Sequence, residues 1–107
     1  MYKNIEKKKI LELNKLVEYQ EGQVVSKTLV QNELISVTIF SFDKDEEIST
    51  HASGGDAMVT VLGGKGKFTI GGDVYYLEKG QTIVMPKDVP HSVFGEEKFK
   101  MLLVVSF

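Results

Sequence analysis

Two histidines, His51 and His91, are the side chains in this sequence best suited to chemistry. A neutral imidazole binds first-row transition metals, and it also accepts and donates protons near neutral pH. Ser53 and Asp56 follow His51 closely, and Asp56 offers a carboxylate as a further ligand if the backbone twists locally. The chain has no cysteine, which excludes disulfides and thiolate chemistry. All thirteen basic residues are lysines, so no arginine is present to hold a carboxylate or phosphate through two parallel hydrogen bonds.

Two short patterns surround these histidines. The first is His51-x-Ser53 followed by the run 57–64, and the second spans 80–95 and contains Pro86 and His91. Together they resemble the two motifs of the cupin family. The first cupin motif reads roughly Gly, five residues, His-x-His, three or four residues, Glu, six residues, Gly. The second reads Gly, five residues, Pro-x-Gly, two residues, His, three residues, Asn.

The resemblance assigns a role to individual positions. His51 matches the first histidine of the first motif, Ser53 the second histidine and Ala57 the glutamate, while His91 matches the histidine of the second motif. Two of the three metal ligands of the first motif are therefore replaced. Three further motif positions also differ, since the family usually has Gly, Gly and Asn where this chain has Asp45, Asp88 and Gly95.

Length and strand pattern indicate a single domain over residues 1–107, long enough to bury a real core. After residue 23, short segments rich in β-branched and aromatic side chains alternate with glycine-rich turns, which is typical of an all-β barrel or sandwich. The resemblance implies the cupin double-stranded β-helix, a jelly-roll barrel, over 23–107. The N-terminal segment 1–22 precedes it. Apolar residues at helical spacing from Ile10 to Val17 predict a short helix within 4–17.

Side-chain alternation predicts which residues face the inside of the barrel. Ala57, Val59 and Val61 share one face of their strand, and the family match turns this face inward. Asp56 then points away from the interior unless the strand bulges. The resemblance and the alternation together predict a ligand pocket lined by His51, Ser53, Ala57, Val59, Met85 and His91.

The last strand, 101–105, is apolar on both faces. A strand buried on both sides needs a second layer outside the barrel. A second copy of the chain would provide this layer in a homodimer, and this is the expectation we favour. The N-terminal segment covering the same face is the alternative.

Two classes of function follow from the histidines. With Ser53 and Ala57 in place of His and Glu, only His51 and His91 remain as metal ligands, with Asp56 as a further candidate. The first class is a protein that binds a small organic ligand in a histidine-lined pocket, with a divalent transition metal (zinc, nickel, iron or manganese) held weakly or not at all. The second is a metal-dependent enzyme of the dioxygenase, isomerase or decarboxylase type, as the resemblance implies.

Composition narrows the possible partners and location. A formal charge of −2 and a pI near 5.7 give no electrostatic reason to expect nucleic-acid binding. No apolar stretch is long enough to span a membrane, and the lysine-rich start lacks the apolar core of a signal peptide. We therefore expect a cytoplasmic protein whose partners are a small-molecule ligand or substrate and a second copy of itself.

Overall fold

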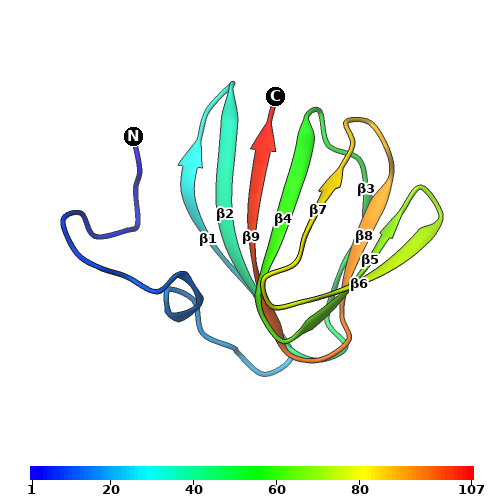
Figure 1. Ribbon diagram of the computed structural model, residues 1–107, viewed down its shortest axis with the longest axis horizontal. Coiled ribbons are helices and arrows are strands. Elements are labelled where there is room, and N and C mark those ends of the chain that lie inside the picture. The colour runs from blue at the N-terminus through cyan, green and yellow to red at the C-terminus, as the bar shows by residue number, and fades with distance from the viewer.

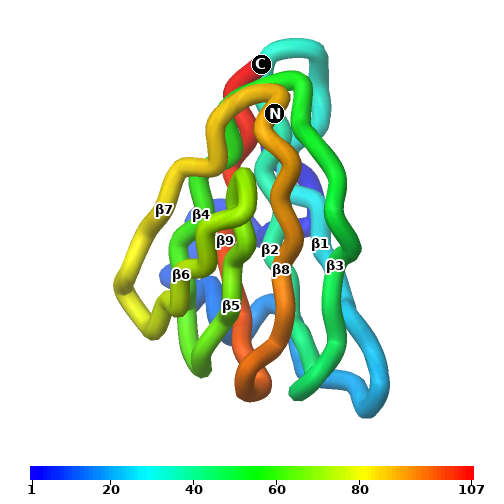
Figure 2. Tube along the Cα trace, turned by 90° about the vertical axis from the view of Figure 1, so that its right-hand side faces the viewer, coloured from blue at the N-terminus to red at the C-terminus, as the bar shows by residue number.

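The computed structural model describes residues 1–107 as nine antiparallel strands in two sheets, with one short 3₁₀ turn near the N-terminus (Figure 1). The five-stranded sheet contains, in spatial order, β1 (Val24–Gln31), β2 (Ile35–Phe42), β9 (Phe99–Ser106), β4 (Asp56–Gly63) and β7 (Thr82–Met85). The four-stranded sheet contains β3 (Glu47–His51), β8 (His91–Gly95), β5 (Lys65–Ile70) and β6 (Asp73–Glu78). Figure 2 looks onto this second sheet, with the first behind it. The all-β jelly-roll fold predicted from the sequence is confirmed.

The predicted alternation along β4 is also confirmed. Ala57, Val59 and Val61 are at most 1% exposed and belong to the main hydrophobic core between the sheets. Met58, on the opposite face, is 40% exposed. Residues directly opposite each other on paired strands point to the same side of a sheet, so the partners of Ala57 and Val59 on β9 also face inward. This register fixes which side chains can reach the interior.

Large aromatic side chains fill the end of the barrel opposite the C-terminus, which we call the base. The rings of Phe42 and Phe99 stack with centroids 4.5 Å apart, and Phe68 meets Phe99 edge-on at 6.0 Å. All three are fully buried. Gly66 lies against them, and a Cβ added there would come within 2.9 Å of ring atoms of Phe68 and Phe99. The base is therefore packed without spare space.

The helical segment expected within 4–17 is present only as the 3₁₀ turn η1 (Leu13–Lys15). Asn4 and Lys8 have positive φ angles of 59° and 56°, which interrupt a right-handed helix. The segment is instead tied to the free edge of the first sheet, where the Lys3 amide donates to the Leu29 carbonyl oxygen at 2.8 Å. Tertiary contacts with a strand edge outweigh the helical spacing of its apolar residues. No helix in the structure has the length and apolar character needed to cross a membrane.

The N-terminal segment covers part of the outer face of the five-stranded sheet (Figure 1). Val17 is buried there in a second cluster with apolar residues of β1 and β2, and Leu62, Leu102 and Val104 pack partly against this cluster. The N-terminal segment, which was the alternative to a second copy of the chain, thus covers part of the outer face of the last strand. Ile10 takes no part, since it is 99% exposed.

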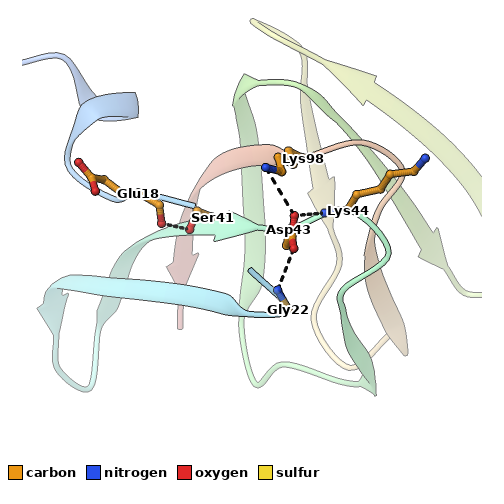
Figure 3. A network of polar contacts seen from close by, with 6 residues as sticks. All are labelled: Glu18, Gly22, Ser41, Asp43, Lys44 and Lys98. Carbon is orange, nitrogen blue, oxygen red and sulfur yellow. Dashed lines mark hydrogen bonds and ion pairs between the residues drawn. The ribbon is translucent and has the colours of Figure 1, made fainter. Parts of the chain in front are cut away.

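Hydrogen bonds join the N-terminal segment to the base of the barrel (Figure 3). Ser41 is fully buried and donates from its hydroxyl to the Glu18 carbonyl oxygen at 2.8 Å. Asp43 accepts hydrogen bonds from the backbone amides of Gly22, at 2.8 Å, and Lys44, at 2.9 Å. These amide donors lower the pKa of the Asp43 carboxyl below its ordinary value.

Candidate functional site

A cavity of about 250 Å³ lies between the two sheets, on the C-terminal side of the aromatic base; we call this end of the barrel the mouth. Twelve residues line it and nine of them are hydrophobic. The lining consists of Phe40, Ile48, His51, Ala52, Ser53, Ala57, Met85, His91, Val93, Met101, Leu103 and Val105. Three other hollows are larger in volume, but five to seven residues line each of them and none contains a histidine. The cavity in the barrel is therefore the candidate site.

His51 reaches the cavity because β3 carries an irregularity. On β3, Ile48 pairs with Val93 of β8, while His51 pairs with His91. Between these two pairs, β3 spans three residues and β8 spans two. One extra residue on one of two paired strands is a β-bulge. In a regular strand, residues three apart point to opposite faces, so the bulge brings Ile48 and His51 to the same side. Both line the cavity.

His91 begins β8 and alternates with Val93, so both point inward. His91 is only 2% exposed, whereas His51 is exposed at the rim. The two imidazole rings meet edge-to-face, with centroids 4.5 Å apart and planes at 70°. The structure thus brings the two histidines together at one cavity.

Backbone carbonyls fix the tautomer of both rings. Nδ1 of His51 lies 2.9 Å from the Ser49 carbonyl oxygen, and Nδ1 of His91 lies 3.1 Å from that of Val89. A carbonyl oxygen only accepts, so Nδ1 carries the proton in each neutral ring and Nε2 keeps a free lone pair. Burial is the main cause that lowers the pKa of His91, and the nearby His51 lowers it further, against the opposing effect of the Val89 carbonyl. Neutral His91 is therefore favoured.

Five of the six residues predicted for the pocket line the cavity, and the sixth, Val59, does not. Val59 has the predicted inward orientation, but it is fully buried among other core side chains and leaves no surface at the cavity wall. Ser53 lies at the mouth, and its hydroxyl oxygen accepts the Gly55 amide at 3.3 Å. Alternation therefore predicts the face of a strand correctly but not which inward side chains remain at the cavity wall.

Asp56, the candidate carboxylate, does not line the cavity. Its Oδ1 accepts a hydrogen bond from the Lys87 backbone amide at 2.8 Å. Ala57 occupies the wall where the resemblance expects a glutamate, so this wall is apolar. The structure contains no group of three or more histidine, cysteine or acidic side chains able to surround a metal ion. Two imidazoles alone are fewer ligands than the three or four of typical zinc sites, so the donor set fits a weakly held ion at most.

Sequence reasoning left several apolar lining residues unassigned to the pocket. They include Ile48, Ala52, Val93, Leu103 and Val105. The period-two pattern of β9 contains a signal for two of them, because Leu103 and Val105 pair with Val59 and Ala57 on β4. Ile48 could not be found in this way, since the bulge in β3 breaks the alternation between it and His51.

The departures from the two motifs at Asp45 and Asp88 keep the backbone shape that glycine provides. Asp45 has a φ angle of 69° and Asp88 one of 63°, both in the left-handed region. Asp adopts this region more readily than most residues, because its short polar side chain bonds locally. Gly95 replaces the usual Asn at a crowded point, where an added Cβ would lie 2.6 Å from the Asp43 carbonyl oxygen.

Comparisons with known proteins agree with this geometry. Residues 38–106 match the family model of the cupin domain. A conserved protein of unknown function from Streptococcus pyogenes is 47% identical, with 98% of this chain and 92% of that chain covered and a TM-score of 0.96. A cupin superfamily protein from Desulfitobacterium hafniense is 28% identical, with 100% and 98% covered and a TM-score of 0.95.

A cupin 2 conserved barrel domain protein from Leptotrichia buccalis is 45% identical over 91% of this chain, with a TM-score of 0.89. The match covers 47% of that protein, so this chain spans about half its length. No curated protein matches the chain. The family match covers more than half of the sequence and includes both histidines, so this chain belongs to the cupin family.

Proposed function

We propose that the cavity at the mouth of the barrel binds a small organic molecule, with its apolar body between the sheets and its polar group at His51 and His91. One observation carries this proposal: a cavity of about 250 Å³ has nine hydrophobic residues among twelve and two imidazoles at one side. Ligand sites are typically apolar hollows with a few placed polar groups. An apolar cavity of about 150 Å³ already holds benzene, so this one has room for a substituted ring.

Binding can be tested by NMR titration of ¹⁵N-labelled protein with toluene, phenol and benzoate as probes. We expect shifts of backbone amides in the strands that line the cavity. Ala57→Leu fills the cavity from one wall and should abolish these shifts. Met58→Leu, one residue along on the outer face, is the matched control and should leave them unchanged. Equal shifts in both variants would contradict the proposal.

A second candidate function is metal-dependent chemistry on such a molecule, through a divalent ion held by His51 and His91. The observation in its favour is that each Nδ1–H donates to a backbone carbonyl, since metal-binding histidines usually donate their other N–H to such a partner. A bound zinc, nickel, iron or manganese ion would supply Lewis-acid or redox chemistry. The backbone carbonyls orient the two rings and leave Nε2 of each as the nitrogen with a free lone pair.

Zinc titration by calorimetry at several pH values tests this candidate. Affinity should be modest and should fall as the pH drops through the imidazole range, because protons compete for the same lone pairs. Ala57→Glu should tighten binding by adding a carboxylate at the cavity wall, and His91→Ala should abolish it. One equivalent of zinc retained by the His91→Ala variant would place the metal elsewhere. Zinc bound only after Ala57→Glu would favour the metal-free pocket.

The assembly proposed with this function is a homodimer through the part of the outer sheet face that the N-terminal segment leaves open. Met58 lies between Val104 of β9 and Val84 of β7 in the sheet register, and Val84 is 49% exposed. Thr60 and Thr82 lie beside this row and bond to each other, so the centre of the face carries no charge. Depletion of charge is typical of interface cores.

Light scattering at high micromolar concentration tests the dimer, whose interface should bury at least about 1,000 Å². Met58→Lys should shift the mass toward the monomer by placing a charge at the centre of this face. A monomer mass for the parent protein would refute the dimer.

A further inference from the structure

We infer that the ligand of this cavity is a neutral hydroxyl compound with an apolar body, such as an alcohol or a phenol, and not a carboxylate or phosphate. This inference rests on the proposed function, and it assigns the chemical class of the ligand. Three observations on the lining residues carry it: no charged side chain, two fixed acceptors and one free donor.

The cavity wall offers nothing that neutralises an anion. Its twelve lining residues include no lysine, arginine, aspartate or glutamate. The only groups able to become positive are the two imidazoles, and their rings lie in contact with centroids 4.5 Å apart. Protonating both would bring two positive charges together in a mostly apolar space, which is unfavourable. A buried carboxylate or phosphate would therefore have no lysine or arginine partner, and burying an unpaired charge is costly.

The two imidazoles demand a hydrogen-bond donor from the ligand. Nδ1–H of His51 is used by the Ser49 carbonyl, and Nδ1–H of His91 by the Val89 carbonyl. Nε2 of each neutral ring is then an acceptor. His91 is 2% exposed, so a ligand that excludes water from it without donating a hydrogen bond leaves a buried acceptor unpaired. A purely apolar ligand therefore carries a penalty that a hydroxyl group avoids.

Ser53 supplies the complementary donor at the mouth. Its Oγ accepts the Gly55 amide, and no hydrogen bond donated by this hydroxyl is present in the structure. Gly55 itself is confined, because an added Cβ would lie within van der Waals overlap of the Ser106 carbonyl oxygen. The amide that holds Ser53 is thus fixed in place. A ligand hydroxyl can donate to an imidazole Nε2 and accept from Ser53, which neither a hydrocarbon nor a carboxylate does.

The test compares phenol, toluene and benzoate by NMR titration at pH 7.5. Phenol and toluene have nearly the same shape and size, so a change in their affinity ratio between the parent and the variants below reports on the hydrogen bonds. We expect phenol to bind at least about tenfold more tightly than toluene, the size of effect that one unpaired buried acceptor produces. Benzoate should bind most weakly, because the cavity wall has no lysine or arginine to pair with its carboxylate.

Substitutions test whether His91, Ser53 and His51 cause the preference for phenol over toluene. His91→Leu should retain toluene binding and lose the preference for phenol, and Ser53→Ala should reduce the preference in part. His51→Leu at the exposed rim provides the same test if the buried substitution prevents folding. Ser92→Ala, on the outward face of β8, is the matched control and should preserve the ratio.

The outcomes separate this inference from the proposed function. Toluene binding as tightly as phenol, or benzoate binding most tightly at pH 7.5, would overturn the hydroxyl class while leaving the pocket as a binding site. Failure of all three probes to shift any cavity residue would overturn the proposed function and the ligand class with it.

Discussion

The two ends of this barrel are built from the same strands, yet one is solid and the other hollow. Along β9, the inward positions run Phe99, Met101, Leu103 and Val105 from base to mouth. Along β4, they run from Val61 and Val59 to Ala57. Inward side chains therefore shrink toward the mouth in both strands. The taper leaves a cavity at one end without any change in backbone architecture.

The four-stranded sheet also differs between the base and the mouth. Gly66 and Gly95 are paired neighbours at the base, and the absence of a side chain at Gly66 makes room for the rings of Phe68 and Phe99. At the mouth the same sheet instead places polar His91 against the hollow. The tightest packing and the cavity thus lie at different ends of one core. Substitutions matched between the ends can break or sharpen this division.

The largest effect is expected from truncating the packed end. Phe99→Ala removes the ring that contacts both Phe42 and Phe68 and should lower the free energy of unfolding by about 3–5 kcal/mol. Val105→Ala removes a side chain beside the existing cavity and should cost less, about 1–2 kcal/mol, because few contacts are lost on that side. Urea unfolding of both variants measures the difference. Equal losses would mean that the mouth is as tightly packed as the base.

Adding atoms should distinguish the ends in the opposite sense. Gly66→Ala places a Cβ within 2.9 Å of two phenylalanine rings and should destabilise the fold by about 1–3 kcal/mol. Ala57→Leu adds more atoms but directs them into the cavity, so its unfolding free energy should stay within about 1 kcal/mol of the parent. Denaturation of the two variants under identical conditions provides the measurement. A larger loss for Ala57→Leu would argue against usable space at the mouth.

Much of this division was predictable from the sequence, and the reasons for the misses are physical. Period-two patterns and the two motifs predicted the β fold and the shared cavity of His51 and His91. They could not predict that His51 needs a bulge in β3, since a bulge depends on how two strands pair. They also placed Val59 in the pocket, because alternation does not show which inward side chains remain at the cavity wall. The expected N-terminal helix is reduced to one 3₁₀ turn, because the start of the segment bonds to the β1 edge instead.

The two ends should also lose stability in separate pH ranges. Burial lowers the pKa of His91 below its ordinary value of 6.5, so the unfolded chain binds this proton more readily. Neutral His91 contributes its whole share of stability when the pH is above the pKa of this histidine in the unfolded chain. That share is lost as the pH falls through its lower pKa in the folded protein. His51 is the titratable group that faces His91, and it also lowers the pKa of His91.

At the base, the amides of Gly22 and Lys44 lower the pKa of Asp43 below its ordinary value of 3.8. Its contribution is present above that value and is lost only in more acidic solution, as the pH falls through the folded pKa. Melting temperatures measured from pH 8 to pH 3 should therefore fall in two stages. His91→Phe should remove the first stage and Asp43→Asn the second. A first stage that persists in His91→Phe would assign it to another group.

The smallest effects on stability are expected at Asp45 and Asp88, which hold equivalent left-handed positions at the two ends. The Asp45 amide donates to the Gly95 carbonyl oxygen at the base, and the Asp88 amide donates to the Ser53 carbonyl oxygen at the mouth, both within 2.9 Å. Glycine relieves the left-handed strain but gives the unfolded chain more freedom, worth about 0.4–1 kcal/mol. The two effects nearly cancel, so Asp45→Gly and Asp88→Gly should each change stability by less than about 1 kcal/mol.

Alanine at these two positions separates stability from binding. It has no polar side chain to favour φ near 65°, so both Asp45→Ala and Asp88→Ala should cost about 1 kcal/mol or slightly more. Only Asp88 lies in the loop that bonds to Ser53 and leads into His91, so only its variant should also weaken phenol binding. Urea unfolding and NMR titration of the same two samples measure both quantities. Weakened binding in Asp45→Ala at equal stability would show that the base is coupled to the cavity, and that the two ends do not act independently.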